Sequence, residues 1–191
     1  MGARTGTRQK MLGSAIELLR ERGAAGVTID AVLARSGAPR GSVYHHFPGG
    51  RAEIMTESLT LAGDAISDLI EEAATRGASG VLAGIAEFWT AILLASDFEA
   101  GCPVVSVAVG GSPEDHHLHP EVANILHRWH DTLTSAITAE GIEPERAGRL
   151  ATMAIASVEG AVILCRVNRS TTALDEVVEE LRVLLAAAVG R

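Results

Sequence analysis

One short segment of the sequence is rich in side chains that donate hydrogen bonds. Its outward-facing residues, none of them acidic, are Arg40, Ser42, Tyr44, His45 and His46. A face that is merely solvated usually mixes acids with bases. Donors without acids match the phosphates and base edges of double-stranded DNA. We therefore expect this segment to bind DNA.

Two short helices joined by a tight turn would position these donors. The apolar stripe of the first helix consists of Ile29, Val32 and Leu33. Thr28 is suited to cap its start, and Gly37 can end it in a left-handed conformation. Pro39 fits the first turn of a second helix, which would bury Val43 and Phe47. An ordinary helical hairpin has the same periodicity, but the donor-rich outer face favours a DNA-binding helix-turn-helix.

The same stretch resembles the DNA-binding domain of TetR-family transcriptional regulators. The matching positions are Thr28-Ile29, Val32, Gly37 and Gly41-Ser42-Val43-Tyr44-His45-His46-Phe47. The sequence departs from the family pattern at Leu33, where a small alanine is usual, and at Pro39, where a capping serine is common. The run Pro48–Arg51 is one residue longer than the family's spacing to a phosphate-binding lysine. This FPGGR ending and the later GCPVVSVAVGG resemble the LmrA/YxaF-like branch.

The resemblance is close over about residues 8–54 and looser beyond. It implies an all-α protein with a helix-turn-helix domain at 1–51 and a helical ligand-binding and dimerisation domain at 52–191. In the family, the last two long helices of each chain pair in a dimer interface, and the dimer binds an inverted-repeat operator. The implied function is a regulator, expected to be a repressor, that a small and largely apolar effector releases from DNA.

Seven residues are predicted to contact DNA. Arg40, Gly41 and Ser42 lie at the N-terminal end of the recognition helix, the end that meets base edges. The predicted phosphate contacts are Thr28, Tyr44, His45 and Arg51, the last taking the role of the family's lysine. Charge supports this location, because residues 1–51 hold eight Lys or Arg and three acids although the 191-residue chain carries a formal net charge of −8.

The remaining apolar stripes predict further helices over about residues 4–22, 51–76, 81–93, 120–141, 144–168 and 172–188. Residues 101–111 favour a strand by propensity, whereas the resemblance implies a short buried helix, which we expect. The predicted ligand-binding residues are Phe88, Trp89, Ile92, Cys102, Trp129 and Glu159. The alternative for the aromatic residues is plain core packing, and the alternative for Glu159 is an exposed edge.

A second polar cluster contains Asp115, His116, His117 and His119. Imidazole and carboxylate groups could bind Zn²⁺ or Ni²⁺, but the spacing matches no specific metal signature, and a polar surface loop is the simpler interpretation. A metal-responsive or redox-responsive regulator using this loop or Cys102 is the alternative function. Two cysteines are too few for a disulfide framework, which fits a reduced compartment.

A small helical enzyme is a more remote alternative. The sequence shows no nucleophile with a paired base, no glycine-rich phosphate loop after a strand and no metal-ligand spacing with a catalytic Glu. We therefore expect no enzymatic activity and no cofactor. The most apolar stretch, Ala151–Cys165, contains Glu159 and is shorter than the roughly 18 residues that cross a membrane. A soluble, cytoplasmic protein is expected.

Overall fold

The computed structural model describes residues 2–110 and 112–189, with side chains from residue 6 onward. Every regular element in these ranges is a helix, which confirms the all-α prediction. The chain packs into two compact units, Met1–Asp64 with Cys102–Ala123, and Ala65–Gly101 with Asn124–Arg191. The functional division between residues 51 and 52 remains a prediction.

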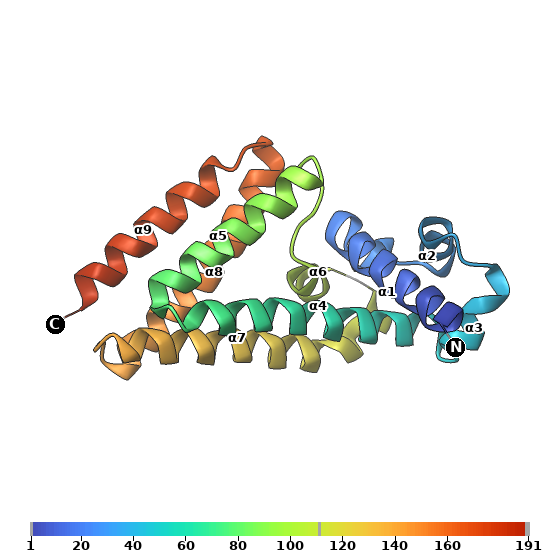
Figure 1. Ribbon diagram of the computed structural model, residues 1–191, viewed down its shortest axis with the longest axis horizontal. Helices are drawn as coiled ribbons and strands as arrows, with labels where there is room; N and C mark the ends of the chain where they lie inside the picture. Colours follow the sequence, from blue (N-terminus) through green and yellow to red (C-terminus); the bar gives the residue numbers. More distant parts are fainter. Residues whose placement is uncertain (1, 111, 190–191) are drawn as a thin grey trace. The chain divides into compact units, whose positions relative to one another are not determined.

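The first unit contains α1 (Gly2–Arg22), α2 (Ile29–Ser36), α3 (Val43–His46), the start of α4 (Gly50–Ala74) and α6 (Pro103–Val109) (Figure 1). α1 packs against both α2 and α6. The core of the first unit comes from several of these helices and includes the fully buried side chains of Met11, Leu18, Leu19, Phe47 and Ile54. This core fixes α2, whose N-cap is the predicted DNA contact Thr28, and α3, which carries the predicted contacts Tyr44 and His45.

The helical conformation of α6 overrides the local β-propensity of its valines. Pro103 occupies the first turn, where its missing N–H costs no hydrogen bond. Val104 and Val107, three residues apart, are completely buried, whereas Val109 is exposed. Burial on one face of a helix therefore outweighs propensity, and the structure confirms the helix implied by the resemblance.

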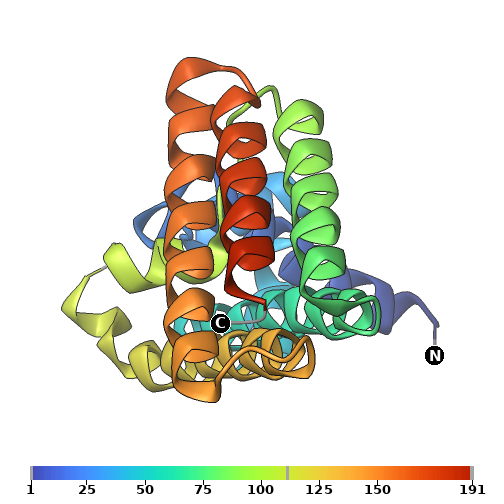
Figure 2. The same cartoon turned by 90° about the vertical axis from the view of Figure 1, so that its left-hand side faces the viewer.

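The second unit is built from α5 (Gly77–Ala95), α8 (Pro144–Asn168) and α9 (Thr172–Ala188), with the later parts of α4 and α7 (His119–Ala139). Figures 1 and 2 show α5, α8 and α9 lying side by side, and each of them contacts the other two. Alanines on α8, among them Ala147, Ala151 and Ala161, are buried and permit close helix packing.

The N-cap of α9 is Thr171, whose hydroxyl donates to Asp175 Oδ2 at 3.3 Å. One local expectation is corrected. The segment Pro113–Leu118 is a 3-10 helix that leads directly into α7, not an irregular surface loop. Asp115 in this 3-10 helix is only 1% exposed. Its carboxylate is paired with Arg51, a residue distant in sequence.

The expectation that no stretch is long enough to cross a membrane is also corrected. By length and composition alone, α5 and α8 each pass that test. Both helices contact α9 and each other in the second unit, and core helices of soluble bundles pass the same test. Their apolar length therefore does not by itself indicate a membrane protein.

Candidate DNA-binding face and effector cavity

The start and end of α2 are fixed as predicted. Thr28 has an extended backbone, and its Oγ1 accepts a hydrogen bond from the Ala31 N–H at 3.1 Å. Gly37 has a φ of 66°, and its N–H donates to the Leu33 carbonyl at 3.0 Å. A residue with a Cβ is strained at this φ, so glycine suits the turn between the two helices.

The recognition segment is shorter and starts later than the sequence suggested. Pro39 stays extended and caps a 3-10 turn, Arg40–Ser42, which continues into the four residues of α3. Val43 and Phe47 are completely buried, and Tyr44 is 64% exposed. The inward and outward faces are therefore as predicted, but Pro39 precedes the helix instead of lying in its first turn.

Gly50 brings the start of α4 close to Tyr44. Its φ is 62°, and a Cβ at this position would lie 3.5 Å from the Tyr44 ring and 3.9 Å from Ile29 Cδ1. The preceding Gly49 N–H donates to Glu53 Oε2 at 2.7 Å. The extra glycine that separates this sequence from the usual family spacing thus forms a tight entry into α4.

The structure brings together four of the seven predicted DNA-binding residues. An open hollow on the first unit is lined by Thr28, Ile29, Asp30, Arg40, Tyr44 and Arg51. Arg40 and Asp30 form a salt bridge with both side chains largely exposed. Gly41, Ser42 and His45 are exposed or half-buried nearby in sequence but do not line the hollow. The Ser42 hydroxyl donates to the Pro39 carbonyl at 2.6 Å.

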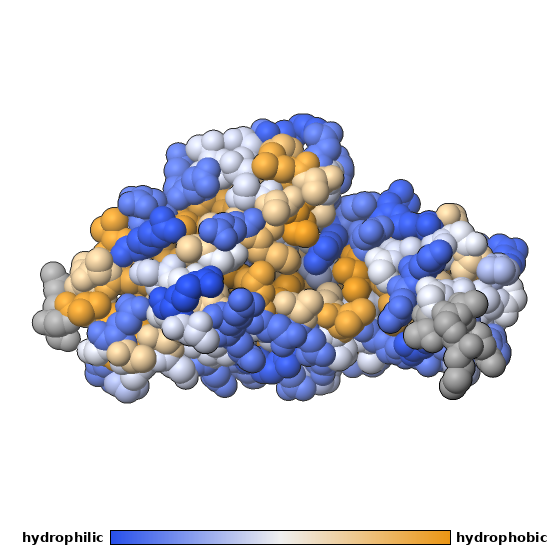
Figure 3. Space-filling view, viewed as in Figure 1, coloured by the Kyte–Doolittle hydropathy of each residue, from blue (hydrophilic) through white to orange (hydrophobic). Residues whose placement is uncertain are grey.

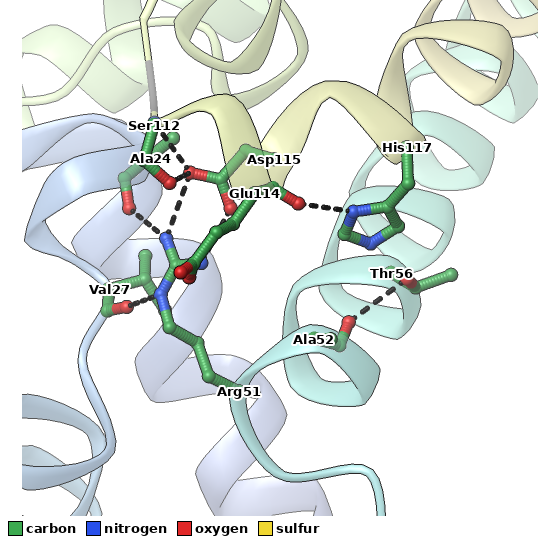
Figure 4. A network of polar contacts seen from close by, with 9 residues as sticks. All are labelled: Ala24, Val27, Arg51, Ala52, Thr56, Ser112, Glu114, Asp115 and His117. Carbon is green, nitrogen blue, oxygen red and sulfur yellow. Dashed lines mark hydrogen bonds and ion pairs between the residues drawn. The ribbon is translucent and has the colours of Figure 1, made fainter.

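Arg51, predicted to contact phosphate, makes several contacts inside the protein, and its role on DNA stays a prediction. Its guanidinium donates to the carbonyls of Ala24 and Val27 and forms an ion pair with Asp115, as Figure 4 shows. Arg51 also lines the hollow, and its side chain is 27% exposed. Local sequence patterns cannot indicate this arrangement, because Arg51 and Asp115 are 64 residues apart.

The second unit encloses a small cavity of about 50 Å³ between α4, α5, α7 and α8. Its wall is aliphatic apart from Trp89, Trp129 and Glu159, three of the predicted ligand-binding residues. Trp129 Nε1 donates to Ser67 Oγ at 2.9 Å, which satisfies the polar atom of a buried ring. Among the residues described, Glu159 is the one ionisable side chain in this wall, and it is half-buried.

The other three predicted ligand residues do not line this cavity. Phe88 packs its ring edge-to-face on Trp89, with 5.1 Å between the centroids, and Ile92 lies nearly one turn past Trp89. Cys102 belongs to the first unit, where its thiol interacts electrostatically with Arg20. The wall also contains residues that were not predicted to bind a ligand, such as Ile66, Val81 and Ile155. In the sequence they belong to the apolar stripes of ordinary core helices.

The structure gives the metal alternative no support. Within residues 2–110 and 112–189, no group of three or more His, Cys, Asp or Glu side chains could hold a metal ion. Asp115 is paired with Arg51, and His117 Nδ1 lies 2.7 Å from the Glu114 carbonyl oxygen. Cys102 and Cys165 are buried free thiols, and burial raises the pKa of Cys165.

An apolar surface runs over α8 and α9. Its exposed members are Met153, Ile163, Leu164, Val167, Val183 and Leu184. A groove on the same two helices is lined by Met153, Val177, Leu181 and Leu184, with Glu176 and Glu180 at its border. Figure 3 shows apolar side chains at the surface in the region of α9. These are the helices that the resemblance assigns to dimerisation.

Comparison with known proteins agrees with this architecture. The family described as "Bacterial regulatory proteins, tetR family" matches residues 12–57, and "Transcriptional regulator LmrA/YxaF-like, C-terminal domain" matches residues 78–180. An HTH-type transcriptional regulator of Mycobacterium tuberculosis is 42% identical over 95% of each chain. The HTH-type transcriptional regulator LmrA of Bacillus subtilis is 28% identical over 88% of this chain and 90% of its own.

The fold is also that of solved regulators. The crystal structure of a regulatory protein TetR from Rhodobacter sphaeroides superimposes with a TM-score of 0.81 at 18% identity, covering 92% of this chain and 96% of that one. The relatives and structural neighbours are regulators rather than enzymes. From its helix-turn-helix, its helical second unit and these matches, the chain belongs to the TetR family of transcriptional regulators, in the LmrA/YxaF-like group.

Proposed function

We propose that this regulator is a cytoplasmic repressor that binds an inverted-repeat operator as a homodimer and leaves it when a small, largely apolar effector binds. The observation that carries the proposal is the exposed donor face of the recognition segment beside the capped start of α2. Family membership makes DNA the natural partner of this face. Repression, dimerisation and the effector's chemistry are our inferences.

On DNA, the N-terminal end of the recognition segment enters the major groove. Arg40, with Gly41 and Ser42 beside it, contacts base edges, and a bidentate Arg–guanine pair discriminates by about 1–3 kcal/mol. Tyr44, His45 and the N-terminus of α2 at Thr28 contact phosphates, which fix the register but carry no sequence information. Arg51 has a different role, argued in the next subsection.

The effector enters the cavity between α4, α5, α7 and α8. Its volume of about 50 Å³ is below the roughly 300 Å³ of a typical small-molecule site, so binding has to separate these helices. A ligand with an apolar body and one basic or hydrogen-bond-donating group fits two indole rings and the Glu159 carboxylate. It shifts the protein away from the DNA-binding state because it selects a conformation with a larger cavity.

The apolar surface on α8 and α9 supports dimerisation. A closed pair of identical chains needs a self-complementary patch, and exposed apolar side chains on two adjacent helices provide one. A twofold dimer presents two recognition segments related by symmetry. Such a dimer matches a palindromic operator with half-sites about one helical turn, or a multiple of it, apart.

Anisotropy titrations against the DNA flanking this protein's own gene, at two salt concentrations, test the proposal. We expect selective binding by a dimer that weakens steeply as salt rises, since phosphate binding releases counterions. Selection from random DNA follows if that fragment is not the operator. Affinity equal to that for random DNA after selection would show that the recognition segment does not read sequence.

A further inference from the structure

A buried ion pair joins three segments of the first unit that are distant in sequence. Asp115, in the 3-10 helix before α7, is 1% exposed, and its Oδ1 lies 2.5 Å from Arg51 Nη1. Its Oδ2 accepts from Arg51 Nη2 at 3.1 Å, from the Ser112 N–H at 3.0 Å and from the Ser112 hydroxyl at 3.3 Å. The carboxylate therefore has hydrogen-bond donors on both oxygens, as Figure 4 shows.

The same guanidinium also binds the backbone just before the helix-turn-helix. Arg51 Nε donates to the Val27 carbonyl at 2.6 Å, and Nη2 donates to the Ala24 carbonyl at 2.9 Å. Together with the bonds to Asp115, these contacts engage the Nε, Nη1 and Nη2 groups of the Arg51 guanidinium as donors. A phosphate contact would require Arg51 to give up bonds that it already makes inside the protein.

One of these two carbonyls belongs to the residue beside a predicted DNA contact. Val27 directly precedes Thr28, the N-cap of α2, and Thr28 lines the hollow beside Tyr44 and Arg40. The hydrogen bond from Arg51 to the Val27 carbonyl thus restrains the backbone at the start of α2. Lysine cannot replace this contact, because an ammonium group lacks the planar fork that reaches a carboxylate and two carbonyls at once.

We propose that Arg51 and Asp115 are positioning residues for operator recognition: their ion pair fixes the start of α2 from the segment that leads into α7. This inference rests on the DNA-binding function proposed above and assigns Arg51 an internal role in place of a phosphate contact. Asp115 acts only through Arg51, and neither side chain reads a base.

The first test compares Arg51→Lys and Asp115→Asn by hydrogen exchange of the backbone amides in residues 28–36, without DNA. Both variants conserve size, and Lys also conserves the charge. If the pair fixes α2, exchange in this range is at least tenfold faster in both variants, while α8 and α9 exchange as in the wild type. Unchanged exchange in residues 28–36 in both variants would overturn the proposal, whatever the protein does on DNA.

The second test measures affinity for the selected operator and for random DNA over a salt series. We expect both variants to bind the operator about tenfold more weakly, with affinity for random DNA and the salt slope unchanged, because no phosphate contact is lost. If Arg51 instead contacts phosphate, Arg51→Lys keeps operator affinity, and Asp115→Asn strengthens binding to both DNAs by removing a negative charge.

Matched controls separate this role from a general effect of losing an ion pair. Arg149 and Glu145 form an exposed pair one turn apart on α8. Arg149→Lys and Glu145→Gln should leave amide exchange in α2 and both DNA affinities at wild-type values. A wild-type protein that fails to distinguish operator from random DNA would count against the proposed function, whereas the exchange test would still decide the role of the pair.

Discussion

Arg40 Nη2 lies 2.5 Å from Asp30 Oδ1, across the turn between the two helices of the helix-turn-helix. Both side chains are about four-fifths exposed, so the pair contributes little to stability. We expect the pair to matter for recognition instead, because Asp30 holds the guanidinium that we expect to read a base.

Arg40→Ala should relax the sequence preference at one base pair of each half-site. The expected loss is about 1–3 kcal/mol for the preferred base and little for the others. Binding-site selection with the wild type and the variant measures this directly. An unchanged preference at every position would show that Arg40 does not read a base. Asp30→Asn, tested alongside, should weaken the preference at the same base pair because Arg40 loses the carboxylate that holds its guanidinium, while binding to random DNA should strengthen because a negative charge is removed.

Tyr44→Phe should weaken binding to all sequences by the same factor. Tyr44 is exposed on α3, and the loss of one hydrogen bond from an uncharged hydroxyl to a charged phosphate costs about 1.5–3 kcal/mol. Because no charge is removed, the salt slope should stay the same. Titrations with operator and random DNA give both quantities. A loss confined to the operator would indicate that Tyr44 takes part in base recognition.

Ala154→Val should block the effector without affecting DNA binding. Ala154 lines the cavity and is 7% exposed, so two added methyl groups fill space that a ligand needs. We expect folding stability within about 1.5 kcal/mol of the wild type, and at least a tenfold higher effector concentration for release from the operator. Release at the wild-type concentration would mean that the effector binds elsewhere.

Asp115→Asn should remove one source of acid sensitivity. The hydrogen bond from Arg51 holds the pKa of Asp115 below its ordinary value of 3.8, against the opposing effect of burial and with help from Ser112. A depressed folded-state pKa adds stability that is complete above the unfolded-state value and disappears as pH falls through the folded-state value. The variant should therefore be about 2 kcal/mol less stable at neutral pH.

This difference should shrink below about pH 4 as the wild-type carboxylate becomes protonated. Denaturant titrations of both proteins from pH 7 downward measure this difference in the free energy of unfolding. The contributions of the other acidic residues are the same in both proteins and cancel in the comparison. A difference that stays constant down to pH 2 would show that the charge of Asp115 does not contribute to folding.

Val167→Lys should weaken the dimer and, with it, operator binding. Val167 is 75% exposed on the apolar face of α8, where an ammonium group would have to be desolvated in a twofold interface. Val109→Lys is the matched control, since Val109 is 81% exposed on α6. Analytical ultracentrifugation should show dissociation at micromolar concentration for Val167→Lys alone. Equal dimerisation of both variants would place the interface on another surface.

Local signals were sufficient to predict much of the fold. The cap at Thr28, the stop at Gly37 and the burial of Val43 and Phe47 all depend on neighbours within a few residues. The later start of the recognition segment was missed because Pro39 is equally compatible with a first helical turn and with an extended cap. The helix at residues 103–109 required the family resemblance, since its valines favour strands.

Long-range partners could not be predicted. Nothing in the spacing of Arg51 or Asp115 indicates that these two residues form an ion pair. The cavity shows the same limit. Periodicity identifies Trp89 and Trp129 as inward-facing, but whether inward residues fill a core or enclose space depends on how four helices pack.

The chain contains two tryptophans and one tyrosine, which lie in different parts of the structure. Both indole rings lie in the cavity wall, whereas the single phenol is on the recognition segment. Selective excitation of tryptophan therefore reports on the proposed effector site, without a dye or an engineered label. Compound libraries could be screened by intrinsic fluorescence on the unmodified protein, with Trp89→Phe and Trp129→Phe identifying which wall each hit touches.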